Sequence, residues 1–327
     1  MRAASALAST IAALFLLALA GCSATPPELT LSGDLAAHDP ALVAHADGGD
    51  WYVYSTGSAA GDGNIQIRSS PDGRDWSYVG EVWPNKPDWI VATIPGVTNL
   101  WAPDLTEHDG TWYLYYAAST FGSNHSVIAL ATNTTLDPNS PDYRWVDRGP
   151  VLESQKSDDF NAIDPGVAVD ADGDPWMAFG SFWSGIRMVP LHWSDGKLAD
   201  EAEPLRLADR LTPPNAIEGA SIIAHDGWYY LFVSRDSCCR GVHSTYNMAV
   251  GRSQQITGPY EDRDGVSMLA NGGTILLATD GSVIGPGGES ASGGYLAFHY
   301  YDGDNGGATH LEIRPITWGP DGWPSIG

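Results

Sequence analysis

Cysteine is scarce in this chain of 327 residues, which has three: Cys22, Cys238 and Cys239. Cys22 belongs to an N-terminal leader described below, and the other two are adjacent, so no disulfide framework links distant parts of the chain. Adjacent cysteines also lack the spacing of zinc ligands. We therefore expect Cys238 and Cys239 either to bridge one another or to remain two buried thiols.

Basic residues are also few, with 16 lysines and arginines against 40 aspartates and glutamates and a formal charge of −24. This balance argues against a nucleic-acid partner, because phosphate binding needs clustered lysine and arginine. A neutral polymer is compatible with the charge, which also suits a soluble extracellular surface.

Long hydrophobic runs are missing except near the N-terminus, where residues 11–20 are apolar but too few to remain across a bilayer. This run ends in Leu19-Ala20-Gly21-Cys22, which is similar to the lipobox of bacterial lipoproteins. Acylation of Cys22 would anchor the protein to the membrane at the cell surface. If Cys22 is incidental, the leader predicts a plainly secreted protein. The expected segments are a signal peptide over residues 1–21, a tether over 22–30 and one domain over 31–327.

No long segment with the apolar period of an amphipathic helix follows residue 30, whereas 38 glycines and 22 prolines are present. Instead, an aromatic segment with strand-like alternation recurs, and two copies follow directly on Asp-Gly, a hairpin turn signal, at Asp109-Gly110 and Asp226-Gly227. This repetition predicts an all-β fold, a five-bladed β-propeller of four-stranded blades. A β-sandwich is the alternative, but it offers no reason for five copies. The copies begin at Trp51, Trp112, Trp176, Trp228 and Tyr295.

Four of the five aromatic segments are preceded by an acidic residue: Asp39, Asp104, Asp164 or Glu218. The first strand of each propeller blade lines the central axis, so we expect these residues to converge on one pocket. Carboxylates that face one another repel, so one keeps its proton while another stays ionised, which is the acid and base that glycoside hydrolysis needs. Taken singly, each acid is also explained as turn chemistry. Asp104 is the weakest candidate, because its segment equally suits a turn that positions Trp101.

Several motifs occur in one order along the chain: His38-Asp39-Pro40, Asn99 to Asp104, Ser119 to Asn124, Asn161 to Pro165, Gly180 to Trp183, Ile217-Glu218-Gly219 and Cys238 to Tyr246. Together they resemble the five-bladed propeller glycosidases of family 43 and, within that family, the endo-α-1,5-L-arabinanases. The resemblance covers nearly the whole mature chain, and the segment that begins at Cys238 is its arabinanase-like part.

The resemblance implies a catalytic role for three of the acids. Asp39 would be the general base that activates water, Glu218 the general acid, and Asp164 the carboxylate that raises the proton affinity of Glu218. The family inverts the anomeric carbon, and its substrate here would be arabinan, cut at internal bonds. An exo-acting α-L-arabinofuranosidase or β-xylosidase on the same fold is the nearest alternative. A non-catalytic glycan-binding surface lipoprotein is a further one.

The resemblance also implies substrate contacts and a metal. A furanose has an apolar face that stacks on aromatic rings, which makes aromatic residues near the pocket sensible platforms. His299 would lie beneath the site beside one structural calcium ion surrounded mostly by water, and a satisfied structural histidine is the alternative. No organic cofactor is expected, and the protein should be a monomer. Besides Asp39 and Asp164, the expected contacts are Trp101, Phe121, Gly122, Asn161, Ala162, Ile163, Ser181, Phe182 and Trp183.

Overall fold

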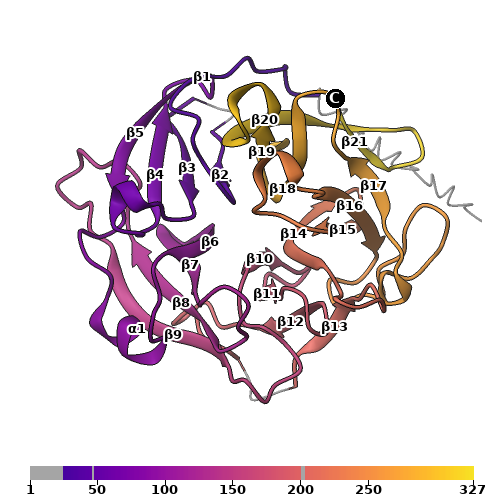
Figure 1. Ribbon diagram of the computed structural model, residues 1–327, viewed down its shortest axis with the longest axis horizontal. Coiled ribbons are helices and arrows are strands. Elements are labelled where there is room, and N and C mark those ends of the chain that lie inside the picture. The colour runs from indigo at the N-terminus through magenta and orange to yellow at the C-terminus, as the bar shows by residue number, and fades with distance from the viewer. Residues whose placement is uncertain (1–24, 46–47, 200–202) are drawn as a thin grey trace, which may run out of the picture.

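The computed structural model describes residues 25–45, 48–199 and 203–327, which form five β-sheets around a central axis (Figure 1). The prediction of an all-β, five-bladed β-propeller is confirmed. Across these three ranges, no helix is both long and apolar enough to cross a membrane. The predicted signal peptide and the lipidation residue Cys22 lie outside the described residues.

Each blade is one antiparallel sheet whose strands follow chain order from the axis to the rim, and blade 1 gains a short parallel strand at its outer edge. Blade 1 comprises β2 (Ala41–Val43), β3 (Trp51–Ser55), β4 (Gln66–Ser70), β5 (Asp75–Glu81) and the outer strand β1 (Ser32–Gly33). Blade 2 comprises β6 (Leu100–His108), β7 (Thr111–Ala118), β8 (Ser126–Asn133) and β9 (Val146–Ser154). Blade 3 comprises β10 (Gly166–Val169), β11 (Pro175–Phe179), β12 (Ile186–Pro190) and β13 (Leu205–Ala208).

Blades 4 and 5 repeat this order. Blade 4 comprises β14 (Ile217–His225), β15 (Trp228–Arg235), β16 (Asn247–Ser253) and β17 (Thr274–Leu277). Blade 5 comprises β18 (Val283–Ser292), β19 (Tyr295–Asp302), β20 (Ala308–Trp318) and β21 (Pro324–Ile326). Among the described residues, the helical elements are α1 (Asp88–Thr93) and the 3-10 turns η1 (Ala59–Gly61), η2 (Gly241–His243), η3 (Met268–Ala270) and η4 (Gly303–Asn305).

The five aromatic segments form the second strand of each blade: β3, β7, β11, β15 and β19. Each contributes a fully buried ring to the packing between sheets, and burial of one such side chain contributes about 1.5–3 kcal/mol. The Asp-Gly pairs before β7 and β15 have positive φ at both residues, as a hairpin turn of this kind requires. The recurring rings are Tyr54, Tyr116, Phe179, Phe232 and Phe298.

The ring closes where blade 5 meets blade 1, which the yellow and indigo ends of the chain show side by side in Figure 1. The hydroxyl oxygens of Ser290 and Ser292 on β18 accept hydrogen bonds from the backbone N–H groups of Leu42 (2.9 Å) and Ala44 (3.1 Å). Closure therefore fixes the innermost strands of the first and last blades against each other, and with them the acids that these strands carry.

Candidate active site

A residue with positive φ lies within, or just before, the innermost strand of every blade. Its φ is 49° at Asp39, 41° at Ala102, 55° at Asp164, 64° at Gly219 and 61° at Gly288. Asp39 and Asp164 thus occupy equivalent positions in blades 1 and 3. Asp104 and Glu218 instead lie within their innermost strands, beside points where the pairing with the second strand shifts register. Non-glycine residues rarely adopt this conformation, and it concentrates at functional sites.

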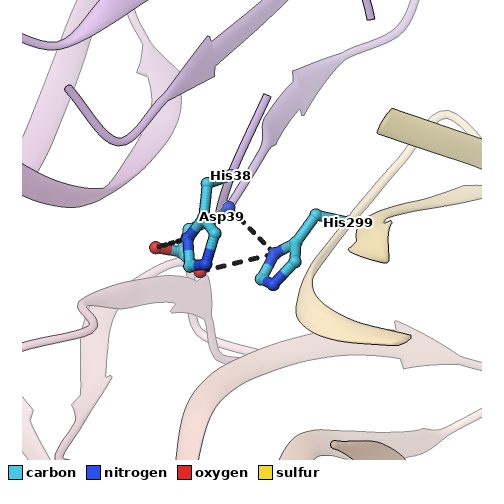
Figure 2. Close-up of side chains that lie close together, drawn as sticks. All are labelled: His38, Asp39 and His299. Atoms are coloured by element: carbon cyan, nitrogen blue, oxygen red, sulfur yellow. Dashed lines mark hydrogen bonds and ion pairs between the residues drawn. The ribbon is translucent and has the colours of Figure 1, made fainter. Parts of the chain in front are cut away.

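Asp39 makes four polar contacts with His38, Thr56 and His299, and Figure 2 shows those with the two histidines. His38 Nδ1 lies 2.8 Å from Asp39 Oδ2, Thr56 Oγ1 donates to the same oxygen at 2.7 Å, and His299 Nδ1 lies 3.6 Å from Oδ1. The backbone N–H of Asp39 donates to His299 Nδ1 at 3.1 Å. Burial alone would raise the pKa of Asp39, but the charge and hydrogen bond of His38 outweigh it and hold that pKa well below its usual range. Asp39 is therefore an ionised, oriented carboxylate.

The pKa values of Asp164 and Glu218 are both raised. Burial, followed by the charges of Glu218 and Asp39, raises the pKa of Asp164 well above its usual range. Burial also raises the pKa of Glu218, although hydroxyl contacts from Ser181 and Tyr246 oppose that rise. A hydroxyl donates to a carboxylate or accepts from a carboxylic acid, so Glu218 keeps both contacts in either state. The protonation therefore belongs to the pair, not to Glu218 alone.

Asp104 serves blade packing. Its Oδ2 accepts a hydrogen bond from the backbone N–H of Val167 in the next blade at 2.9 Å, and burial raises the pKa of Asp104 to about 6. The glycine at position 166 also has a packing reason, because a Cβ there would lie 2.1 Å from the carbonyl oxygen of Ala220. Both residues join blade 3 to its neighbours.

Glu289, which sequence reasoning missed, is the acid of blade 5. A cavity of about 40 Å³ is lined by Asp39, Asp104, Asp164 and Glu289 among others, so the acids of four blades do converge. Burial raises the pKa of Glu289 to about 8. Ser234 Oγ donates to its Oε2 at 2.5 Å, while Oε1 is buried and has no hydrogen-bond partner among the described residues. The pseudo-symmetry of the blades was the signal that could have revealed Glu289. This residue, however, lies one position after Gly288, the residue with positive φ in blade 5, and within a glycine-rich segment.

Several predicted substrate contacts are buried beneath the site. Ser181 donates to Glu218, and Asn161 Oδ1 accepts a hydrogen bond from Ser126 Oγ at 2.6 Å. Ile163 is 7% exposed, and Ala162 has no exposed surface and packs in a core cluster. Ser181 therefore contacts one of the predicted acids, whereas the side chains of Asn161, Ala162 and Ile163 are buried in the surrounding packing.

Except for Trp101, the other predicted contacts lie on loops that join the second and third strands of blades 2 and 3. Phe121 is 87% exposed and precedes Gly122, which has a φ of 79°. Trp183 is 39% exposed, and Asn215 Nδ2 donates to its carbonyl oxygen at 2.7 Å. Phe182 is half-buried with positive φ, and Trp101 is half-buried on β6. Phe121 and Trp183 thus present apolar surface from two blades.

His38, Asp39 and His299 form a group whose potential ligand atoms all lie within 4.8 Å of one another. Their lone pairs are already engaged, however. His299 Nδ1 accepts from Asp39 N–H, so the proton of the neutral ring sits on Nε2, and burial lowers the pKa of His299 well below its usual range. Direct ligation by all three would break these contacts. Nε2 of His299 is buried without a hydrogen-bond partner in the described part of the chain, which fits contact with water or with the water shell of an ion.

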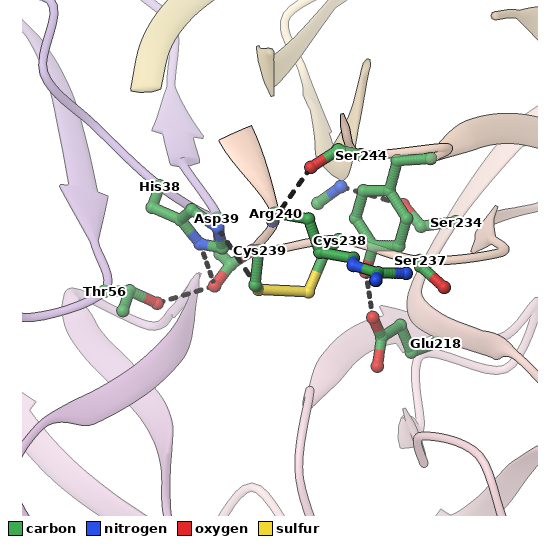
Figure 3. The surroundings of a disulfide bond; sticks show 12 residues. His38, Asp39, Thr56, Glu218, Ser234, Ser237, Cys238, Cys239, Arg240 and Ser244 are labelled. Carbon is green, nitrogen blue, oxygen red and sulfur yellow. Dashed lines mark hydrogen bonds and ion pairs between the residues drawn. A yellow bond between two sulfur atoms is a disulfide. The ribbon is translucent and has the colours of Figure 1, made fainter. Parts of the chain in front are cut away.

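Cys238 and Cys239 form a disulfide, which resolves the two possibilities left by the sequence (Figure 3). The loop lies between β15 and β16, and Cys239 Sγ is 3.8 Å from His38 Nε2. The backbone N–H of Cys239 donates to Tyr301 Oη at 2.7 Å. The disulfide loop therefore lies directly beside the residues that hold Asp39.

The chain is similar to known proteins in both sequence and structure. The sequence profile described as "Glycosyl hydrolases family 43" matches residues 33–324. An extracellular endo-α-(1→5)-L-arabinanase of Bacillus subtilis (strain 168) is 39% identical over 307 residues, or 93% of this chain and 92% of that protein. An extracellular exo-α-(1→5)-L-arabinofuranosidase of Cellvibrio japonicus (strain Ueda107) is 38% identical, over 88% of this chain and 86% of that protein. A Cellvibrio cellulosa α-L-arabinanase, solved with arabinohexaose, is 37% identical, with a TM-score of 0.83 over 90% of this chain and 96% of that one.

Proposed function

The chain belongs to family 43 of the glycosyl hydrolases, and we propose that it hydrolyses α-1,5-linked arabinan at internal bonds, with inversion at the anomeric carbon. The observation that carries the proposal is the division of the acids. Asp39 is held ionised, while the pKa values of Asp164 and Glu218 are both raised, which favours their protonated forms. A fixed base and a separate proton donor are the two groups that inverting hydrolysis requires.

In the proposed reaction, Asp39 takes a proton from the water that attacks the anomeric carbon. Glu218 protonates the glycosidic oxygen as the carbon–oxygen bond breaks. The charge of Glu218 raises the pKa of Asp164, so the two carboxyl groups lie close enough to interact, and an ionised Asp164 would in turn favour the protonated form of Glu218. His38 and Thr56 hold the carboxylate of Asp39 in one orientation, and Ser181 and Tyr246 do the same for Glu218.

Cleavage of internal bonds is the finer part of the proposal. Phe121 and Trp183 present exposed rings from blades 2 and 3, which would let a chain lie across the face and extend on both sides of the acids. The B. subtilis relative is named as endo-acting, which supports this reading. The C. japonicus relative, named as exo-acting at nearly the same identity, supports exo cleavage as the second candidate.

The products formed early in digestion separate the two candidates. Purified protein is incubated with linear arabinan, and the products are resolved by anion-exchange chromatography before a tenth of the bonds are cut. A ladder of oligosaccharides is expected for internal cleavage. A single small product from the first time point would assign exo action. Unchanged polymer, with binding retained, would favour a glycan-binding surface protein.

Two further parts of the proposal concern a metal and location. We propose that a hydrated calcium ion lies near His299, where the unpartnered Nε2 faces it through water. When bound, the ion would add positive charge beneath the acids. We also propose that Cys22 is acylated and anchors the protein at the cell surface, where it meets polymeric arabinan. The curated relatives named above are described as extracellular, which supports an extracytoplasmic location.

A further inference from the structure

A chain of close polar contacts runs from the disulfide loop to Asp39. The backbone N–H of Cys239 donates to Tyr301 Oη at 2.7 Å, and Tyr301 Oη lies 3.1 Å from His38 Nε2. His38 Nδ1 then lies 2.8 Å from Asp39 Oδ2. Each residue of this chain contacts the next, and the last of them is the proposed general base.

In a neutral His38 ring, the contact with Tyr301 bears on which nitrogen carries the proton. Tyr301 Oη accepts from Cys239, which leaves the proton of its own hydroxyl available to His38 Nε2. When Nε2 accepts a hydrogen bond from that hydroxyl, the ring proton is on Nδ1, the nitrogen that lies 2.8 Å from Asp39 Oδ2. In the charged ring both nitrogens carry protons, and Nε2 then donates to Tyr301 Oη. In either state, Tyr301 is a partner for Nε2 while Nδ1 carries a proton beside the base.

The ring of His38 is also fixed in space from two sides. It stacks on His299 with ring centroids 3.8 Å apart, and Cys239 Sγ lies 3.8 Å from its Nε2. The bond between Cys238 and Cys239 closes a small ring, which restricts the backbone that presents the Cys239 N–H. Tyr301 is 3% exposed, so its hydroxyl is shielded from bulk water and from the substrate.

We propose that Tyr301, anchored by the Cys238–Cys239 loop, is a positioning residue that orients the general base Asp39 through His38. The inference rests on the proposed function, because it requires Asp39 to be the base. A group that only orients a base acts on the rate of the chemical step and leaves substrate binding nearly unchanged. Turnover should thus respond to Tyr301 while KM does not.

The first test removes one hydroxyl. Tyr301→Phe is expected to lower kcat on linear arabinan at least tenfold and to change KM less than twofold. Tyr260→Phe is the matched control, because Tyr260 is as fully buried as Tyr301 and its hydroxyl donates a hydrogen bond to the carbonyl oxygen of Ile256 at 2.8 Å, away from Asp39. That variant should keep kcat within twofold. A Tyr301→Phe protein with wild-type kcat, or with a loss confined to KM, would overturn the inference.

A double-mutant cycle with His38→Asn tests the route. The asparagine amide can still donate to Asp39 but no longer depends on Tyr301, so Tyr301→Phe should change kcat less than twofold in that background. Losses that multiply would show that Tyr301 acts by another route. Should Tyr301→Phe fail to fold by circular dichroism, Cys238→Ser/Cys239→Ser takes its place, with the same loss of kcat expected and the same lack of additivity with His38→Asn.

Asp39→Asn distinguishes failure of this inference from failure of the proposed function. If Asp39→Asn is inactive while Tyr301→Phe behaves like wild type, only the positioning role is wrong. If Asp39→Asn retains wild-type turnover, the assignment of the base is wrong, and the positioning role falls with it.

Discussion

Replacement of Glu289 by glutamine should make the protein more stable, and increasingly so as the pH rises. The pKa of Glu289 is raised from 4.5 to about 8 by burial in the central channel. Below pH 4.5 the folded and unfolded chains both hold the proton. Between pH 4.5 and about pH 8 the unfolded chain releases the proton of Glu289 while the folded chain keeps it, so the stability of the wild-type protein falls as the pH rises. Above pH 8 both states are ionised and the loss is complete.

The magnitude follows from the shift in pKa. A displacement from 4.5 to about 8, at 1.36 kcal/mol for each pH unit, corresponds to about 5 kcal/mol of wild-type stability lost between pH 4 and pH 9. Glutamine has the shape of the protonated acid and can accept the Ser234 hydroxyl, so Glu289→Gln lacks this loss. The free energy of unfolding of the variant should therefore exceed that of wild type by an amount that grows across this range.

Urea unfolding at pH 5, 7 and 8.5 measures the difference, with a chelator present so that no bound cation keeps Glu289 ionised. Glu107→Gln, which removes an exposed carboxyl from β6, is the control and should show no such trend. A difference between Glu289→Gln and wild type that does not change with pH would refute the reasoning, because it would mean that Glu289 is ionised in the folded protein.

Three further predictions concern the substrate, the metal and the anchor. Trp183→Ala and Phe121→Ala should each raise KM for arabinan about three- to tenfold with little change in kcat, since a stacked ring contributes about 0.5–1.5 kcal/mol. Initial rates over a range of arabinan concentrations measure both constants. An unchanged KM would exclude those rings from substrate binding. Treatment with a chelator should lower the melting temperature of protein purified with calcium, and the same shift in a His299→Gln variant would argue against an ion at this position. Cys22→Ser should move the protein from the detergent phase to the aqueous phase of a cell extract, whereas a wild-type protein already in the aqueous phase would contradict the anchor.

The fold could be predicted because it repeats. Five aromatic strands imply five blades, and a propeller brings the first strand of every blade to the axis, so acids distant in sequence were expected to meet. Asp39 and Asp164 were the easiest to find, because they occupy the same position in their blades and each precedes a proline.

The remaining features of the site depend on contacts that no local pattern reports. Glu289 is displaced by one residue from the repeat, and its burial is visible only when the channel is assembled. The packing role of Asp104 depends on the backbone of the next blade. The link from Cys239 through Tyr301 to His38 joins blade 4 to blades 5 and 1, and these three residues lie far apart in the sequence.

The central claim is that Glu218 is the proton donor in the cleavage of arabinan, and Glu218→Gln tests it most directly. Glutamine can keep contacts with Ser181 and Tyr246 but has no proton to give, so binding should persist. The measurement is the initial rate on linear arabinan, together with arabinan binding by isothermal titration calorimetry. We predict a loss of kcat of at least a thousandfold with the dissociation constant changed less than threefold. A variant that retains turnover close to wild type would contradict the account.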